Sequence, residues 1–144
     1  MGLIDGDHVI DLNKAQPQVN ADLRLALKSG VDLAAAAQNA RASSAERLPL
    51  SSLTLSPIMP EPGKIICLGL NYFDHAKEGG RDKPEYPWFF LRCASSLLAP
   101  GENAILPKVS ERLDYEAELA VVIGKTVKHA TMDNALDCVF GYSC

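Results

Sequence analysis

An acidic stretch that leads into a short apolar run most constrains the fold of this 144-residue chain. Residues 113–125 read L-D-Y-E-A-E-L-A-V-V-I-G-K, with acids at every second position: Asp114, Glu116 and Glu118. The run from Leu119 to Ile123 is rich in valine and isoleucine and stops at Gly124, which is typical of a buried strand. Side chains two apart on a strand share a face, so we expect the three acids side by side at its mouth.

Two interpretations of this acidic face remain open, because three neighbouring carboxylates repel one another. A bound divalent cation would remove the repulsion, and ligation by oxygen alone favours Mg²⁺, Mn²⁺ or Ca²⁺ over Zn²⁺. Alternatively, the acids lie on an exposed face of the strand and are simply solvated. The stretch by itself does not decide between a metal site and a solvated face.

The composition is that of a globular protein, with 47% hydrophobic and 22% charged residues. No apolar run approaches the roughly 18 residues of a membrane span, and the first residues show no basic and then apolar leader. A net charge of −4 and a pI near 5.3 argue against a nucleic-acid partner. The four cysteines form no C-x-x-C pair, which favours reduced thiols in a cytoplasmic protein. We therefore expect neither a membrane nor a nucleic acid as a partner.

A cluster of prolines with Gly63 breaks regular structure and predicts a domain boundary near residue 60. Before it, we expect a hairpin over residues 3–12, a helix over 21–29 capped by Asn20, a helix from Asp32 to about Arg47, and a strand over 48–55. The second helix is rich in alanine and has a thin apolar stripe, so we expect it to pack on little. Residues 1–60 contain no pattern that indicates chemistry.

The second predicted buried strand, residues 64–70, leads into N-Y-F-D-H-A-K-E at 71–78. Asn71 can cap a helix of two turns that ends at Gly79, with His75 and Glu78 on one face. In that arrangement Glu78 accepts a hydrogen bond from one ring nitrogen while the other acts as a base. The alternative is a solvated histidine and glutamate on a short helix. The loop over residues 79–87 has two glycines and two prolines, which is typical of a surface loop, and we interpret the short helix with this loop as a lid.

A third apolar strand runs from Trp88 to Leu91 and ends at Arg92, with Trp88 expected in the core. Arg92 can bind a carboxylate in a bidentate manner, or it can pair with one of the acids. Further on, the pattern predicts a short strand at residues 105–106, a helix capped by Thr131 and the start of a strand at residue 142.

Four motifs follow one another in the second part of the chain: I-I-C-L-G-L-N-Y-F-D-H-A-K-E (65–78), W-F-F-L-R-C-A-S-S-L-L (88–98), D-Y-E-A-E-L-A-V-V-I-G-K (114–125) and A-L-D-C-V-F-G-Y (135–142). In this order they closely resemble the fumarylacetoacetate hydrolase family. The resemblance covers about residues 62–144, and the first 61 residues look like the variable N-terminal domain of many bacterial members. It implies an α+β protein, with a small N-terminal α/β domain over residues 1–60. The first part of a mixed, mainly β catalytic domain would then occupy residues 61–144.

The resemblance also assigns roles to single residues. Glu116 and Glu118 match the two glutamates of the family's metal motif, whereas Asp114 is not a ligand in that pattern. His75 matches the catalytic histidine, and Glu78 matches its partner in the lid helix. Arg92 is expected to contact substrate, although many members have a lysine followed by proline at this place. The remaining metal ligand of the family is an aspartate a few residues beyond the end of the chain, so we expect the front half of a longer protein.

The activity implied is hydrolysis of a C–C bond in a β-diketo or 2-oxo acid of the acylpyruvate or fumarylpyruvate type, as in the catabolism of aromatic compounds. Mg²⁺, or Mn²⁺ or Ca²⁺, would hold the substrate as an enolate while the His-Glu dyad activates water. A cytoplasmic homodimer is expected. The alternatives are an isomerase, decarboxylase or lyase of the same family, a structural member without turnover, or a fragment of 15.5 kDa that is inactive and binds metal weakly.

Overall fold

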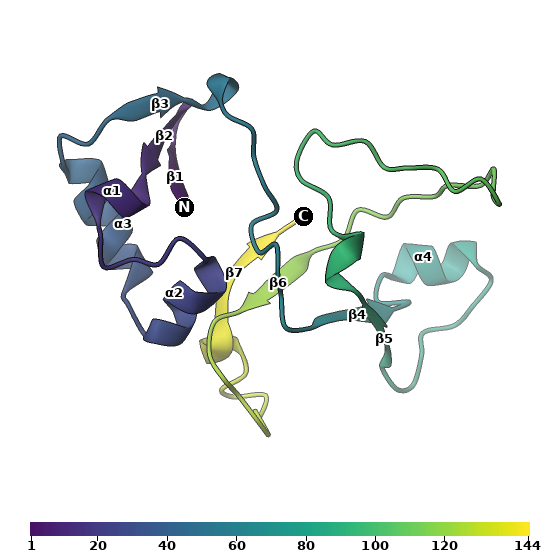
Figure 1. The fold of residues 1–144 in the computed structure, drawn as a ribbon. Coiled ribbons are helices and arrows are strands. Elements are labelled where there is room, and N and C mark those ends of the chain that lie inside the picture. Colours follow the sequence, from purple (N-terminus) through teal and green to yellow (C-terminus); the bar gives the residue numbers. More distant parts are fainter. The chain divides into compact units, whose positions relative to one another are not determined.

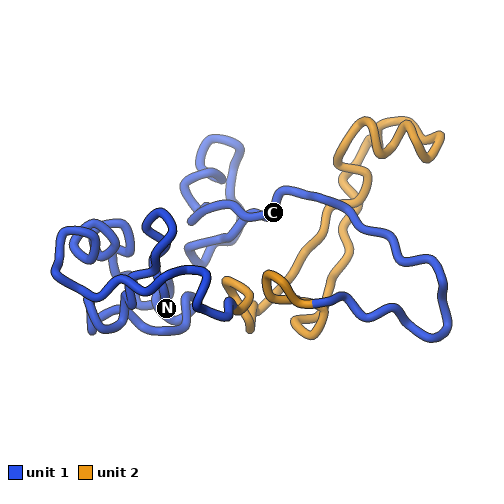
Figure 2. Tube along the Cα trace, turned by 90° about the horizontal axis from the view of Figure 1, so that it is seen from above, with its two compact units in different colours: residues 1–55, 103–144 blue, residues 56–102 orange.

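A computed structural model describes all residues, 1–144, and the chain divides into two compact units (Figure 2). Unit 1 consists of Met1–Leu55 together with Asn103–Cys144, and unit 2 consists of Ser56–Glu102. None of the helices is both long and apolar enough to cross a membrane. The division of the sequence into domains at residues 1–60 and 61–144 remains a prediction.

An antiparallel sheet of three strands begins unit 1 (Figure 1). β1 (Gly2–Asp5) pairs with β2 (His8–Asp11), and β2 pairs on its other side with β3 (Arg47–Pro49). The predicted hairpin is confirmed, and its turn contains Gly6 with a φ of 65° that suits glycine. The strand predicted over residues 48–55 is wrong beyond Pro49, because the chain turns there into the 3-10 helix η1 (Leu50–Ser52).

Three helices accompany this sheet, and each begins after an aspartate that caps it: α1 (Leu12–Ala15), α2 (Leu23–Ser29) and α3 (Leu33–Ala42). The carboxylates of Asp11 and Asp22 each accept hydrogen bonds from two backbone N–H groups of the first turn, and that of Asp32 accepts one, from Ala35. The predicted cap of α2 was wrong: Asp22 caps the helix, and Asn20 instead accepts a hydrogen bond from the N–H of Asp22 at 2.9 Å. α2 stops at Gly30 as predicted, where φ is 75°.

The core of unit 1 lies between the sheet and these helices. Ile10 on β2 is completely buried, and the other buried members of the cluster are Leu12, Val19, Ala26, Ala36 and Ala40. Two of them, Ala36 and Ala40, belong to α3, so the expectation that this helix packs on little was wrong. Small side chains let a helix approach its neighbours closely, so the residues of a thin apolar stripe can be buried while the rest of the helix stays partly exposed.

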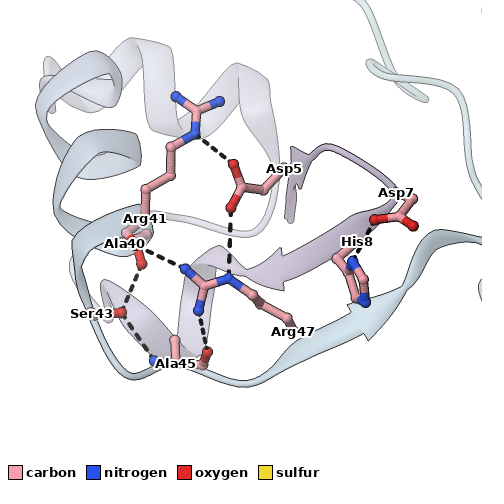
Figure 3. Close-up of polar contacts among 8 residues, drawn as sticks. All are labelled: Asp5, Asp7, His8, Ala40, Arg41, Ser43, Ala45 and Arg47. Atoms are coloured by element: carbon pink, nitrogen blue, oxygen red, sulfur yellow. Dashed lines mark hydrogen bonds and ion pairs between the residues drawn. The ribbon is translucent and has the colours of Figure 1, made fainter.

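α3 ends at Ala42, earlier than predicted, because the backbone becomes extended at Ser43, and polar contacts hold this end of the helix (Figure 3). The Ser43 hydroxyl donates to the carbonyl of Ala40 at 2.8 Å. Asp5 on β1 pairs with the Nε of Arg41 at 3.2 Å and with the Nε of Arg47 at 3.6 Å. Arg47 also donates to the carbonyl of Arg41 at 2.8 Å, so one carboxylate and two guanidinium groups connect β1, α3 and β3.

Unit 2 is built on a hairpin of β4 (Ile65–Gly69) and β5 (Trp88–Arg92), with α4 (Phe73–Glu78) between them and the 3-10 helix η2 (Ala94–Ser96) after them. Both strands were predicted, but the prediction that they are buried was wrong. Every residue of β5 is exposed, and the Trp88 side chain expected in the core is 52% exposed. A sheet of two strands buries little without another layer packed on it.

A second hairpin belongs to unit 1 and consists of β6 (Ala120–Ile123) and β7 (Val139–Ser143), with a shift in register between Val122 and Ile123. The strand predicted at residues 105–106 is not formed, and the predicted helix after Thr131 is replaced by turns and the 3-10 helix η3 (Leu136–Cys138). The strand predicted from residue 113 begins only at Ala120. Pairing with β7 extends no further than Ala120, opposite Ser143, and a strand needs a hydrogen-bonded neighbour.

Candidate functional site

The first part of the candidate site is α4, which carries His75 and Glu78. The helix begins after Tyr72 rather than after the predicted cap Asn71, and it stops at Gly79 as expected. Between the two polar residues lies Ala76, which is buried and only 3% exposed. His75 and Glu78 are both exposed. At positions i and i+3 of one helix they are neighbours on its surface, as the proposed dyad requires.

The loop after α4 holds two residues that sequence reasoning missed. The Cζ atom of Arg81 lies 5.9 Å from the ring centre of Trp88, and the Nζ atom of Lys83 lies 5.7 Å from the ring centre of Phe73. Both distances suit cation–π contacts. The available signal was the presence of basic residues within a few positions of aromatic residues on both sides of the loop.

Arg92 is the last residue of β5 and lies opposite Ile65 on β4. Its side chain is exposed, and it belongs to the same unit as His75 and Glu78. The chain leaves the strand at Cys93 and turns into η2. A guanidinium at the end of a strand is available to a carboxylate, so a contact with substrate stays a prediction for Arg92.

The second part of the candidate site is the pair Glu116 and Glu118, which belongs to unit 1. Both lie just before β6 in a segment without regular structure, so the prediction that they stand on a strand was wrong. Glu116 is exposed and Glu118 is half-buried. Asp114, the third acid of the stretch, accepts a hydrogen bond from the N–H of Tyr115 at 2.9 Å. The three acids therefore differ in their surroundings.

The donor atoms of Glu116 and Glu118 fit a hard divalent cation. In residues 1–144 there is no group of three or more histidine, cysteine, aspartate or glutamate side chains that could hold a metal ion. Mg²⁺, however, is commonly held by one or two carboxylates, with water and substrate supplying its other ligands. Two carboxylates separated by one residue supply oxygen donors of the type that Mg²⁺ and Mn²⁺ favour.

Comparison with known proteins decides the family. Residues 64–144, more than half of the chain, match the family described as Fumarylacetoacetate (FAA) hydrolase C-terminal. The chain belongs to the fumarylacetoacetate hydrolase family. The matched range begins one residue before β4. It contains α4, the β4–β5 and β6–β7 hairpins and all five predicted site residues.

Curated relatives extend the similarity to nearly the whole chain. An oxaloacetate tautomerase named as mitochondrial from Xenopus laevis is 38% identical over 141 residues, which cover 98% of this chain and 44% of the relative. A human oxaloacetate tautomerase, also named as mitochondrial, is 36% identical over 139 residues, which cover 96% of this chain and 44% of the relative. The chain thus spans less than half the length of these relatives.

Solved structures of the family have the same fold. A crystal structure from Mycobacterium smegmatis has a TM-score of 0.80 at 32% identity, over 98% of this chain and 49% of that one. Maleylpyruvate hydrolase from Sphingobium sp. SYK-6, solved in complex with manganese(II) ion and pyruvate, has a TM-score of 0.75 at 30% identity. That match covers 98% of this chain and 52% of the hydrolase. The mixed helix and strand architecture implied by the sequence motifs is therefore that of the family.

Proposed function

We propose that this chain supplies the catalytic dyad and two metal ligands of an enzyme that hydrolyses a C–C bond in a 2-oxo acid of the acylpyruvate type. The observation that carries the proposal is α4, which presents His75 and Glu78 together on the exposed surface around buried Ala76. The likeness to a maleylpyruvate hydrolase that binds Mn²⁺ and pyruvate supports a divalent cation and an oxo-acid substrate. A cytoplasmic homodimer is part of the same proposal.

Each of the five residues has one task in this reaction. Glu116 and Glu118 would hold the cation, which when bound supplies positive charge where negative charge develops on the substrate. His75 takes a proton from water, and Glu78 orients the imidazole by accepting a hydrogen bond from its other nitrogen. Arg92 pairs with a carboxylate of the substrate.

The bonds made and broken follow from the substrate. The water oxygen bonds to the carbonyl carbon distal to the oxo-acid group, and the adjacent C–C bond breaks. The electron pair of that bond goes to the carbon that becomes the methyl group of pyruvate, which then takes up a proton. One acylpyruvate and one water molecule thus give one carboxylic acid and one pyruvate. All atoms and charges of the reactants appear in these two products.

Isomerisation is the second candidate, and a specific observation favours it. The relatives that cover 96–98% of the chain at 36–38% identity are named oxaloacetate tautomerases. The same imidazole can move a proton between carbon and oxygen of an enol and its ketone, without the addition of water. Decarboxylase and lyase activities on related oxo acids remain alternatives of the same class.

A panel of oxo acids tested on the intact protein separates these candidates. Maleylpyruvate, acylpyruvates and oxaloacetate are supplied with Mg²⁺, Mn²⁺ or Ca²⁺, and again with a chelator. Metal-dependent release of pyruvate and a carboxylic acid from maleylpyruvate or an acylpyruvate indicates hydrolysis, and release of pyruvate and CO2 from oxaloacetate indicates decarboxylation. Enol–keto interconversion of oxaloacetate without loss of carbon indicates a tautomerase. Absence of both with every metal would contradict the proposal.

Two substitutions in the intact protein separate the dyad from the metal ligands. His75→Ala should lower kcat by about 10²–10⁴-fold, because it removes the base, while metal affinity stays nearly unchanged. Glu116→Gln should weaken metal binding, measured by titration calorimetry. His8→Ala is the matched control, since His8 is a half-buried histidine that pairs with Asp7 on the N-terminal hairpin. Unaltered turnover in His75→Ala would sink the assignment of the dyad.

A further inference from the structure

The helix that carries His75 and Glu78 is too short to be stable by itself. α4 has six residues, and isolated helices below about 12–15 residues are marginal in water. Its one buried residue is Ala76, whose methyl group contributes little apolar area. The orientation of α4 therefore depends on contacts made from outside the helix.

The C-terminal end of α4 closes in a Schellman motif. Gly80 has a φ of 64°, and its N–H donates to the carbonyl of Lys77 at 3.0 Å. The N–H of Arg81 donates to the carbonyl of Ala76 at 2.9 Å. These two hydrogen bonds satisfy carbonyls that the end of a helix would otherwise leave without partners. They also fix the backbone of Arg81 relative to the helix.

The loop that follows is attached through two cations that lie over aromatic rings. Arg81 contacts the ring of Trp88, which is the first residue of β5, at 5.9 Å. Lys83 contacts the ring of Phe73, which is the first residue of α4, at 5.7 Å. Both lie within the range of about 6 Å in which the face of a ring attracts a cation. Arg81 thus ties the end of the helix to the sheet, and Lys83 ties the loop to its start.

The entry to α4 is constrained as well. Leu70 connects β4 to the helix with a φ of 53°, a conformation that a leucine keeps only where the surrounding structure holds it. The start of the helix therefore has a constrained joint and the Lys83–Phe73 contact, and its other end is followed by the Arg81–Trp88 contact. All of these residues belong to unit 2.

We propose that Arg81 and Lys83 are positioning residues. Through Trp88 and Phe73 they hold α4 on the β4–β5 hairpin and thereby set the orientation of His75 and Glu78. This rests on the proposed function, because orientation of α4 matters for turnover only if the helix carries the dyad. The two cations act through the helix and do not contact the reacting atoms.

The experiment compares three double variants of the intact protein. Arg81→Gln with Lys83→Gln removes both cations, and Arg81→Lys with Lys83→Arg keeps them. The matched control is Arg24→Gln with Lys28→Gln, which removes the same charge from the exposed surface of α2 in unit 1. Three readouts are taken: amide exchange in α4, kcat and KM, and fluorescence of Trp88, which is the sole tryptophan of the chain.

Removal of both cations should speed amide exchange in α4 by about two- to fivefold for each cation, in keeping with the strength of exposed cation–π pairs. The emission of Trp88 should change, because the guanidinium no longer lies over its ring. kcat should fall by a similar factor at unchanged KM and metal affinity. The conservative double variant should restore most of the wild-type behaviour, and the α2 control should resemble the wild type in all readouts.

Two results would overturn the proposal. Unchanged exchange and emission would show that the cations do not hold α4. A raised KM with unchanged kcat would show that they bind substrate directly, since that pattern marks the removal of uniform binding. The proposed function fails separately, when the wild-type intact protein turns over no oxo acid or when His75→Ala retains full turnover. Exchange and fluorescence still decide in that case whether the two cations hold the helix.

Discussion

The N-terminal 55 residues and the β4–β5 hairpin differ in the burial of their apolar side chains. In the N-terminal part, Ile10 is fully buried, and the alanines of α3 pack against the same cluster. In the hairpin, Ile66 pairs with Leu91 and Leu68 pairs with Phe89, so these four side chains share one face. Their exposed fractions run from 38% to 73%. One region has its own core, whereas the other has an apolar surface.

The difference lies in the layers and not in the apolar content of the strands. Three helices pack beside the N-terminal sheet, and their alanines and leucines fill the space between helix and strand. A β-sheet buries its apolar face only against another layer, and no such layer covers this face of the β4–β5 hairpin. His75 and Glu78, the residues proposed as the dyad, thus lie beside a hairpin that buries little, whereas residues 1–55, which contain no pattern that indicates chemistry, have the best-packed core.

Ile10→Ala is expected to have the largest effect on stability. It removes most of the largest fully buried side chain, so the free energy of unfolding of the N-terminal part should fall by about 2–5 kcal/mol. Urea denaturation followed by amide exchange in β2 and α3 measures the change. A decrease below about 1 kcal/mol would show that this cluster is not what holds the N-terminal part together.

Gly124→Ala tests the β6–β7 hairpin. A Cβ atom at Gly124 would lie 2.8 Å from the Cβ of Phe140, which is closer than such atoms approach, so the strands must shift. We expect a cost of about 1–3 kcal/mol, seen as faster amide exchange in β6 and β7. Gly141→Ala is the control, because a Cβ there meets nothing within 4 Å. Equal effects of the two substitutions would contradict this packing.

Asp5→Asn should have a smaller effect on the N-terminal part. It removes the charge that pairs with Arg41 and Arg47, and such partly exposed pairs contribute about 1 kcal/mol or less. The difference in unfolding free energy from the wild type should shrink at high salt, because salt screens exposed charges. Asp7→Asn serves as the control, since Asp7 is highly exposed and pairs only with His8. A difference that does not depend on salt would argue for another cause.

Phe89→Ser should have the smallest effect, and it sharpens the contrast with Ile10. Its side chain is 66% exposed, so the free energy of unfolding of this chain should change by no more than about 0.5 kcal/mol. Self-association measured by light scattering should decrease, because exposed apolar patches promote it. A destabilisation as large as that of Ile10→Ala would show that the face is covered in solution.

Parts of the fold were predictable because their signals are local. Continuous apolar runs bounded by turn residues located β4 and β5, and the glycines at positions 30 and 79 marked the ends of two helices. The helix that carries His75 and Glu78 was predictable for the same reason. The choice of Asp22 over Asn20 as a cap was not, because both residues can cap and only the path of the chain decides between them.

Other features depend on residues that are distant in the sequence. The strand expected from residue 113 begins only at Ala120, where pairing with β7 begins. The contacts of Arg81 and Lys83 depend on the path of the loop, which the sequence pattern does not describe. The roles of all five site residues remain predictions, and the proposed substitutions test those of His75 and Glu116.

The sequence by itself determined the family, the order of the motifs and the positions of the strands around α4, since these depend on neighbouring residues and on motif spacing. Only the tertiary structure decided which apolar side chains are buried, how far each strand extends and which cations lie over the rings of Phe73 and Trp88. The physical reason is that burial and strand pairing each need a partner surface from another part of the molecule. A run such as residues 88–91 specifies its own apolar surface but not the surface that packs against it.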